Sequence, residues 1–476
     1  MIPLPDVTRV PPAVLEVLRT LRAAGKQAFL AGGAVRDLLR AALGQDAPAP
    51  QDFDIASDAL PEEVQRLFER VILTGAEHGT VTVLLGGAGP GGAGARQVEV
   101  TTFRGEGPYL DGRRPSSVTF LGTIEGDLAR RDFTVNAIAW DPLVPGPGGL
   151  HDPFDGLADL RRHRLRAVGD ASARFAEDGL RPLRAVRFAC TLRLALVPTT
   201  ARAIRGALAT FDLVARERVR DELQKLLVRG APASRGLRLL LRTGLLERIA
   251  PELLVPWAFA EVPAPLDLEP EAANDPRPVS DALAAKWRSA FRRALRAVDA
   301  APPAFVLRVA ALLHGLREAL VPGVIQRLKL SRRETDRLLL LLRERALEYA
   351  PDWTDGACRR AIARIGPEVL DDLWALRRAI SAASGAGPLA HEAQQALEQR
   401  WVALLSVDPP LAIGDLALGG REVIARFGLA PGPALGRLLA GLLDRVLDDP
   451  TLNTKEALLR LSSDLLAAFS TGNPQA

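Results

Sequence analysis

The feature that most constrains this sequence is a change in its hydrophobic pattern near residue 140. Up to that point, short alternating or apolar segments predict strands, at residues 27–30, 52–57, 80–85 and 97–103. Helical spacing lies between them, over residues 12–24, from residue 34 onward and from Pro61 onward. Beyond a Gly/Pro-rich turn at 142–149, helical patterns continue to about residue 470. We therefore predict an α+β protein whose small mixed sheet comes first and whose remainder is all helical.

Arginine dominates the basic residues. Lys and Arg together number 61, of which only five are lysines, and the sequence pI is about 9.4. Guanidinium groups bind phosphates through paired hydrogen bonds and stack on bases, which suits a nucleic-acid surface. A GC-rich genome, whose codons favour arginine and alanine, explains the same composition, so both interpretations stay open.

The cysteines and the N-terminus bear on location. Cys190 and Cys358 lie far apart and show no CxxC or Cys/His spacing, so neither a disulfide framework nor a zinc site is predicted. This favours a reducing, cytoplasmic location. The first residues lack a basic start followed by an apolar stretch, and arginines interrupt the leucine-rich runs. We therefore expect no signal peptide and no contact with a membrane.

Two carboxylates, Asp52 and Asp54, are separated by one residue on a predicted strand. Because side chains alternate along a strand, both point to the same face. Paired carboxylates can hold Mg²⁺, and two such ions can activate an attacking hydroxyl and neutralise a triphosphate. On its own, however, an Asp-x-Asp is more often a solvated strand end than a metal site.

A pair of glycines precedes these carboxylates, where a predicted strand turns into a helix. In the segment Gly32-Gly33-Ala34-Val35-Arg36-Asp37, bare backbone N–H groups at the helix start can face a phosphate, and Arg36 can neutralise it. An ordinary glycine turn beside an exposed arginine has the same sequence.

Further along the chain, Asp178, Arg181, Arg184 and Arg187 recur every third residue on a predicted helix. They form a slowly winding stripe. The alternative is a surface helix with ion pairs between residues three apart, worth a few tenths of a kcal/mol each.

Four motifs in this order resemble the class II family of CCA-adding enzymes and bacterial poly(A) polymerases. They are Phe29–Leu38, Asp52–Asp54, the Arg-Arg-Asp-Phe-Thr-Val-Asn-Ala run at 130–137, and Glu177–Phe188. The segment 217–227 resembles the next characteristic helix of that family. The resemblance is firm over residues 25 to 230 and loose beyond them.

The resemblance implies a role for each matching residue. Asp52 and Asp54 are expected to be the catalytic residues and to bind two Mg²⁺ ions. Nucleotide-binding roles are implied for Gly33, Arg36, Arg131, Asn136, Asp178, Arg181, Arg184 and Arg187. Asp178 and Arg181 are expected to read the Watson–Crick edge of cytosine or adenine, which both present an amino donor beside a ring-nitrogen acceptor. Asp132 is expected to be structural, and Glu99 is left out of the metal set.

The resemblance also implies an activity: addition of the 3′-terminal CCA, or of its terminal A alone, to tRNA from CTP and ATP without a template. The polar segment 104–119 resembles the flexible loop that adding the final A requires, and relatives that add only CC lack it. Addition of A alone would need a separate CC-adding partner enzyme. Residues 75–82 show no match to the basic signature of poly(A) polymerases, which makes a bacterial poly(A) polymerase the alternative function.

A chain of 476 residues can form about three buried cores, and with the resemblance we predict four parts. They are a nucleotidyltransferase head at 1–150, a helical neck with the base-recognition helix at 151–250, a helical body at 251–350, and a helical, RNA-binding tail at 351–476.

The helical parts carry further expectations. Arginine-rich helices at 327–345 and 359–378 are expected to follow the acceptor and TΨC arms of tRNA, or else to be solvated faces. Residues 251–278 are expected to be a connector, and 382–388 a break between helices. Gly315 stands where some relatives carry the aspartate of a His-Asp metal motif, so residues 307–330 are read as packing helices.

Overall fold

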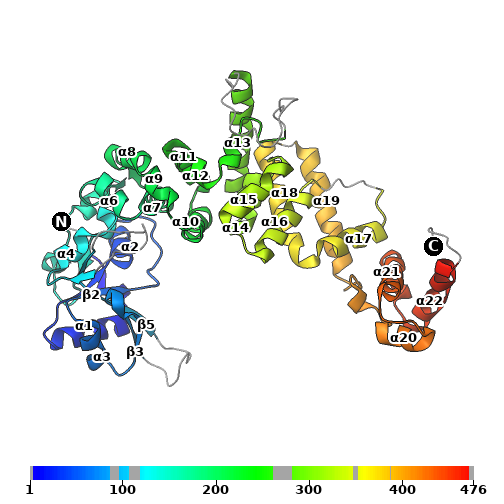
Figure 1. The fold of residues 1–476 in the computed structure, drawn as a ribbon, viewed down its shortest axis with the longest axis horizontal. Helices are drawn as coiled ribbons and strands as arrows, with labels where there is room; N and C mark the ends of the chain where they lie inside the picture. The colour runs from blue at the N-terminus through cyan, green and yellow to red at the C-terminus, as the bar shows by residue number, and fades with distance from the viewer. Residues whose placement is uncertain are drawn as a thin grey trace. The chain divides into compact units, whose positions relative to one another are not determined.

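In the computed structural model, the chain forms two compact units, residues 1–254 with 323–329 and residues 255–322 with 330–476 (Figure 1). The structure describes residues 4–85, 96–106, 118–260, 281–346, 352–385 and 387–470. None of the described helices has the length and the apolar character that a membrane crossing requires.

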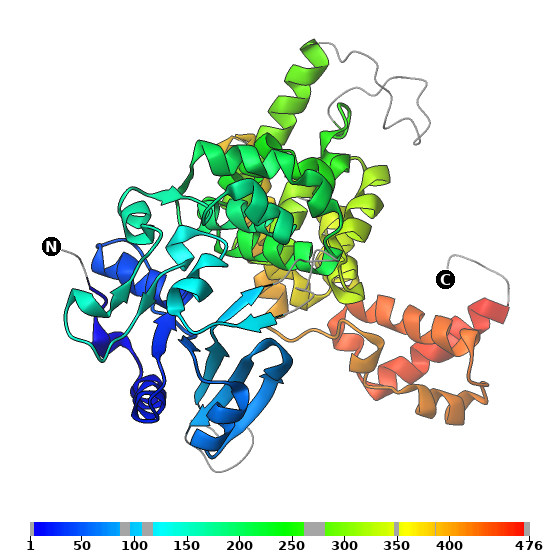
Figure 2. The ribbon, with the colours of Figure 1, turned by 60° about the vertical axis from the view of Figure 1, so that its left-hand side comes forward.

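Unit 1 begins with a seven-stranded sheet in the order β3–β4–β5–β2–β1–β8–β9 (Figure 2). β2 and β5 are parallel, and all other neighbours are antiparallel. The strands are β1 (Ala28–Ala31), β2 (Asp54–Ser57), β3 (Val71–Gly75), β4 (Thr80–Leu85), β5 (Arg96–Thr102), β8 (Ala139–Trp140) and β9 (Leu150–His151). The prediction of a small mixed sheet at the start of the chain is confirmed.

β1 is buried along its whole length, and it positions the segments that follow. Helix α1 (Pro12–Ala23) and helix α2 (Gly33–Ala42) both pack against it. α1 and α3 (Pro61–Leu67) each begin with proline, whose fixed φ suits the first helical position. In the antiparallel register, Ala31 at the end of β1 lies opposite Asp54 at the start of β2, which brings the glycine turn next to the carboxylates.

The rest of unit 1 is mainly helical. Its helices are α4 (Ile124–Ala129), α5 (Gly156–Arg161), α6 (Ala171–Glu177), α7 (Arg181–Thr191), α8 (Pro198–Gly206), α9 (Leu208–Asp212), α10 (Arg216–Arg229), α11 (Ala233–Thr243) and α12 (Leu245–Ile249). The expectation that strands end near Trp140 is wrong, because β9, β10 (Arg164–Leu165) and β11 (Ala195–Leu196) follow. Each has two residues, too few to show a period of two in the sequence.

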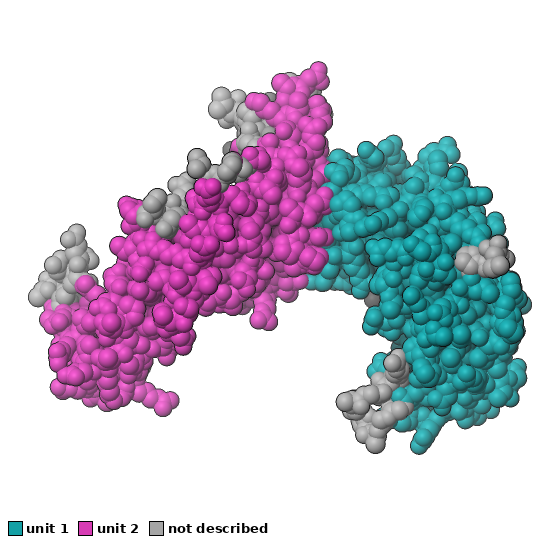
Figure 3. All heavy atoms as spheres, turned by 180° about the vertical axis from the view of Figure 1, so that it is seen from behind, with its two compact units in different colours: residues 1–254, 323–329 teal, residues 255–322, 330–476 magenta. Residues whose placement is uncertain are grey.

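Unit 2, magenta in Figure 3, is built from helices, and its described residues contain no strand beyond an isolated β-bridge between Phe259 and Leu316. Its helices are α13 (Asp281–Ala300), α14 (Phe305–Leu313), α16 (Arg332–Glu344), α17 (Asp355–Ile365), α18 (Leu370–Ser384), α19 (Pro388–Leu405), α20 (Gly420–Phe427), α21 (Pro433–Asp448) and α22 (Lys455–Ser470). The predicted break between helices at 382–388 is confirmed. Residues 307–330 are packing helices as predicted, since α14 is almost entirely buried.

The helices predicted at 327–345 and 359–378 are each interrupted in the structure, so the predicted bounds are wrong. α15 (Val321–Leu328) ends early, and Ser331 then caps α16 by accepting a hydrogen bond from the backbone of Glu334. Gly366, at φ +92°, ends α17 in a conformation that helices do not contain. Both boundaries are visible in the sequence as capping residues.

Three segments lie wholly or mostly outside the described residues: residues 86–95, whose Gly/Pro-rich sequence predicts a hairpin tip, the predicted flexible loop at 104–119 and the predicted connector at 251–278. The described ends of the first are the antiparallel pair β4 and β5. The ends of the second, β6 (Arg104–Glu106) and β7 (Val118–Phe120), also pair antiparallel. The division into head, neck, body and tail stays a prediction.

Candidate active site

One cleft of about 1000 Å³ in unit 1 is lined by every residue that the sequence analysis assigned to the site. These residues are Gly33, Arg36, Asp52, Asp54, Arg131, Asn136, Asp178, Arg181, Arg184 and Arg187. Seven arginines and five aspartates line the cleft in all. Its walls therefore carry an excess of positive charge, which attracts a polyphosphate.

The two carboxylates lie where β2 begins. Asp54 is the first residue of the strand, and Asp52 precedes it rather than belonging to it as predicted. Phe53 between them is buried, whereas both aspartates are exposed, so the two carboxylates point to the same side of the chain. On the neighbouring parallel strand, Glu99 lies opposite Asp54.

Negative charge gathers around Asp54. Partial burial in the cleft raises the pKa of the Asp54 carboxyl. The carboxylates of Glu99 and Asp52 raise this pKa further, whereas Arg131 lowers it. A divalent cation would relieve this repulsion. The described residues contain no cluster of three or more ligating side chains placed to hold a metal. Mg²⁺ is commonly held by one or two carboxylates together with substrate phosphates and water, which fits this pair.

The glycine turn depends on Gly32 as well as on the predicted Gly33. Gly32 has φ +79° and ψ −129°, a conformation that side chains rarely tolerate. A Cβ at this position would lie 2.6 Å from Nη1 of Arg131. The turn therefore lets the arginine lie directly against the backbone at the start of α2, whose first residues line the cleft.

Arg36 reaches the cleft with its charge already paired. Its Nε and Nη2 donate to the carboxylate of Asp37 at 2.9 and 2.8 Å, and its Nη1 donates to Oδ1 of Asn136 at 2.7 Å. The guanidinium carbon also lies 5.4 Å from the ring centre of Phe188. Arg36 was expected from the sequence to neutralise a phosphate, but Asp37 offsets much of its charge. Its orientation is fixed before any ligand binds.

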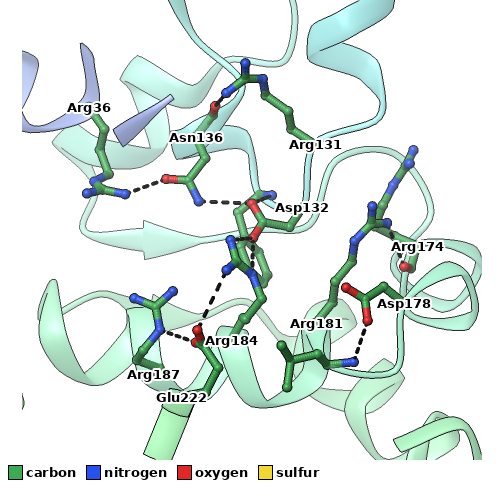
Figure 4. Close-up of polar contacts among 12 residues, drawn as sticks. Arg36, Arg131, Asp132, Asn136, Arg174, Asp178, Arg181, Arg184, Arg187 and Glu222 are labelled. Carbon is green, nitrogen blue, oxygen red and sulfur yellow. Dashed lines mark hydrogen bonds and ion pairs between the residues drawn. The ribbon is translucent and has the colours of Figure 1, made fainter. Parts of the chain in front are cut away.

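Asp132 links the glycine turn to helix α7 (Figure 4). Its Oδ1 accepts from Nδ2 of Asn136 at 3.0 Å, and its Oδ2 accepts from Nε and Nη2 of Arg184 at 2.8 and 2.6 Å. Burial would raise the pKa of Asp132, but Arg184 and Asn136 hold it at about 2. Since Asn136 also binds Arg36, one hydrogen-bonded chain runs from α2 to α7.

Glu222 of α10 extends this chain behind α7. It is buried, forms a short ion pair with Arg187, and lies 3.9 Å from Nη1 of Arg184 (Figure 4). Burial would raise the pKa of Glu222, but Arg187 and Arg184 keep it below its ordinary value. The arginines of α7 therefore do not form a solvated stripe of ion pairs within their own helix. Arg184 and Arg187 pair instead with carboxylates from other parts of the chain.

Asp178 and Arg181 lie at the junction of α6 and α7, where α7 begins only at Arg181. Asp178 therefore precedes the helix on which it was predicted. Its carboxylate accepts from Nη2 of Arg218 at 3.1 and 3.3 Å and from the backbone of Leu180 at 3.0 Å. Arg181 is buried and paired with Glu177 through a short hydrogen bond. Both side chains are held in place at the cleft wall.

The partners that hold the cleft side chains Asp178, Arg181 and Arg187 in place were not predicted from the sequence. Glu177 stands four residues before Arg181, so the helical spacing gave a signal for that pair. Arg218 and Glu222 are four residues apart on α10 and approach α7 only through tertiary packing. Spacing within one segment gives no signal for such contacts.

Comparisons with known proteins agree with this cleft. Residues 28–166 match the family model of the poly A polymerase head domain, and residues 194–255 match the model described as the probable RNA and SrmB-binding site of polymerase A. The CCA-adding enzyme of Levilactobacillus brevis is 46% identical over 229 residues, which is 48% of this chain and 53% of that enzyme. The chain thus matches about half the length of such relatives.

Two further relatives match nearly the whole chain. The CCA-adding enzyme of Limosilactobacillus fermentum is 33% identical over 454 residues, which is 95% of this chain and 96% of that enzyme. The crystal structure of the Bacillus stearothermophilus CCA-adding enzyme in complex with CTP superimposes with a TM-score of 0.69 at 31% identity, covering 96% of this chain and 98% of that one. This chain therefore belongs to the family of CCA-adding enzymes.

Proposed function

We propose that this protein adds the complete 3′-terminal CCA sequence to tRNA, from CTP and ATP and without a nucleic-acid template. The observation that carries the proposal is that the Asp52/Asp54 pair and the Asp178/Arg181 pair line one cleft in a chain of this family. Both cytosine and adenine would be placed by the same cleft, so no separate CC-adding enzyme is required. Because tRNA and the triphosphates are its substrates, we place the reaction in the cytoplasm.

Asp52 and Asp54 would hold two Mg²⁺ ions against the triphosphate. When bound, such ions would neutralise charge on the triphosphate and lower the pKa of the RNA 3′ hydroxyl. Burial raises the pKa of Asp54 most, and the neighbouring carboxylates of Glu99 and Asp52 raise it further. A bound cation would offset both effects, which supports this role. Gly32 and Gly33 allow the triphosphate to approach the start of α2, and Arg131 lies beside that turn.

Asp178 and Arg181 would select the base. A carboxylate acceptor next to a guanidinium donor matches the amino group and ring nitrogen of cytosine or adenine. Guanine and uracil present a carbonyl oxygen to the carboxylate instead, at a cost of roughly 1–3 kcal/mol. Arg218 and Glu177 support this role by fixing the orientation of the two side chains before a nucleotide enters. Arg184 and Arg187 would hold the helix rather than read the base.

A poly(A) tail is the product of the second candidate function. The match to the head domain of poly A polymerase covers chemistry that both activities share. The relatives compared above are CCA-adding enzymes, and residues 75–82 lack the expected basic signature. We therefore propose addition that stops after three nucleotides.

The test is incorporation of labelled CTP and ATP, alone and together, on tRNA transcripts that end at the discriminator base, after C, after CC and after CCA. We expect CCA on the shortest transcript, completion of the next two, and no addition to the last. An unstructured RNA is the control. A single A added only after CC would mean an A-adding enzyme, and long A tails on any RNA would mean a poly(A) polymerase.

A further inference from the structure

One arginine of the active cleft differs from the other six. Arg229, the last residue of α10, lines the cleft and is exposed. Its side chain forms no ion pair or hydrogen bond with any residue that the structure describes. The other six arginines each form an ion pair with a carboxylate of the chain: Arg36, Arg130, Arg131, Arg181, Arg184 and Arg187. Their charges are partly offset, whereas the charge of Arg229 is available to a ligand.

Contacts between α10 and α7 define where Arg229 lies along the cleft. Near the start of α10, Arg218 pairs with Asp178, which belongs to the base-reading pair. One helical turn later, Glu222 pairs with Arg187, which lies toward the end of α7 (Figure 4). Positions 218 and 229 are eleven residues apart on α10, which is about three helical turns, so both lie on the same face of the helix.

The end of α10 lies beside the end of α7. A Cβ on Gly230 would lie 2.9 Å from Sγ of Cys190, so only a glycine allows this close approach. Phe188, one turn earlier on α7 and also in the cleft wall, has its ring centre 5.4 Å from the guanidinium carbon of Arg36 on α2. Arg229 therefore lies at the end of the cleft where α7 meets α2, away from the base-reading pair.

We propose that Arg229 binds the γ phosphate of the incoming nucleoside triphosphate. With the base held by Asp178 and Arg181, the γ phosphate is the part of the nucleotide farthest from that pair. A terminal phosphate presents three free oxygens and a charge of about −1.5 to −2 at pH 7, and a guanidinium binds such oxygens through paired hydrogen bonds. The inference rests on the proposed function, because it takes CTP and ATP as the ligands of the cleft.

Two other roles for Arg229 are outcomes of the test. An arginine in the last turn of a helix suits the negative end of the helix dipole, which contributes to stability and not to nucleotide affinity. Residue 229 also falls within residues 194–255, which match the model described as a probable RNA-binding site. The γ phosphate is favoured because Arg229 shares one cleft with the carboxylate pair and the base-reading pair.

The test measures binding of CTP, CDP and CMP to the full chain by isothermal titration calorimetry, with Mg²⁺ and without RNA. The wild type is compared with Arg229→Gln. Arg19→Gln is the matched control, because Arg19 lies on α1 outside the cleft, is also exposed and has no ion pair among the described residues. Circular dichroism verifies that each variant is folded.

We expect Arg229→Gln to bind CTP about tenfold more weakly than the wild type and the control do, and to bind CMP equally well, because CMP has no γ phosphate. ATP and AMP should show the same difference. In steady-state incorporation, the KM for both triphosphates should rise, while the KM for tRNA and the exclusion of G and U stay unchanged. Arg229→Lys keeps the charge and should recover part of the CTP affinity.

Pyrophosphate gives a second measurement, because nucleotidyl transfer releases the γ phosphate joined to the β phosphate. Inhibition of incorporation by pyrophosphate should be about tenfold weaker in Arg229→Gln than in the wild type and in Arg19→Gln. Equal inhibition of all three proteins would contradict the assignment.

Unchanged affinity of Arg229→Gln for CTP would overturn the proposal. An equal loss for CTP and CMP would also overturn it, because a purely structural role predicts that result. A raised KM for tRNA with unchanged CTP affinity would assign Arg229 to the RNA instead. The binding measurement needs neither RNA nor turnover. A wild-type chain that binds triphosphates through Arg229 but does not build CCA would therefore refute the proposed function alone.

Discussion

Replacing Asp132 with asparagine is expected to destabilise unit 1 and to weaken nucleotide binding. The Asp132 carboxylate is buried and accepts two hydrogen bonds from Arg184 and one from Asn136. An asparagine keeps the size of the side chain but removes its charge, so Arg184 loses its closest counter-ion. The arginine would then be free to leave the cleft wall.

The magnitude follows from the pKa of Asp132, which falls from an ordinary 3.8 to about 2 in the folded protein. At 1.36 kcal/mol per pKa unit, this corresponds to ~2.4 kcal/mol of folding free energy. Because the folded pKa is the lower one, this contribution is fully present above about pH 4 and is lost as the pH falls toward 2. At about pH 3 roughly half of it should remain.

The assay is urea unfolding of the wild type and of Asp132→Asn at pH 7 and pH 3, with steady-state incorporation kinetics at pH 7. Asp141→Asn is the control, since Asp141 is equally buried, pairs with Arg22 and does not line the active cleft. Both variants should be less stable, but only Asp132→Asn should raise the KM for nucleotides. An unchanged free energy of unfolding at pH 7, or the same loss at both pH values, would refute the reasoning.

Four other changes test the cleft. Asp54→Ala should abolish incorporation of both nucleotides while RNA affinity stays within about twofold; surviving incorporation would remove the metal assignment. Gly32→Ala should cost roughly 1–3 kcal/mol and most of the activity, because of its φ and the approach of Arg131; thermal unfolding and kinetics at wild-type level would contradict this. Asp178→Ala should admit G and U more than it lowers triphosphate affinity, and continued exclusion of both bases would disprove base reading. Deleting residues 105–116 should suppress A addition before C addition, and primer extension with unchanged A addition would contradict the loop assignment.

Much of the fold was predictable because its signals are local. Pro12 and Pro61 mark helix starts, and alternating residues mark β4 and β5. The two-residue strands after Trp140 were not predictable, because they depend on pairing with a distant partner rather than on their own pattern.

The residues of the site could be predicted from the sequence, but most of the contacts among their side chains could not. The resemblance of four motifs selected side chains that all line one cleft. It gave no indication that Arg36 is paired with Asp37, because adjacent residues seldom form such bidentate contacts on a helix. Nor did it identify Glu222, which is 35 residues from its partner Arg187 in the sequence. These contacts are set by tertiary packing.

The hydrogen-bonded chain from Arg36 through Asn136 and Asp132 to Arg184 has a consequence for engineering. These hydrogen bonds connect the two walls of the cleft, so a change to the side chains of one wall will also disturb the other. A variant that replaces Arg184 in order to accept another base would remove the positively charged partner of Asp132. The buried carboxylate of Asp132 would then be left unpaired. Such a redesign must supply a new positive group at that point. Substitutions confined to Asp178 would leave the hydrogen bonds among Arg36, Asn136, Asp132 and Arg184 intact. They are therefore the simpler way to change which nucleotide the cleft prefers.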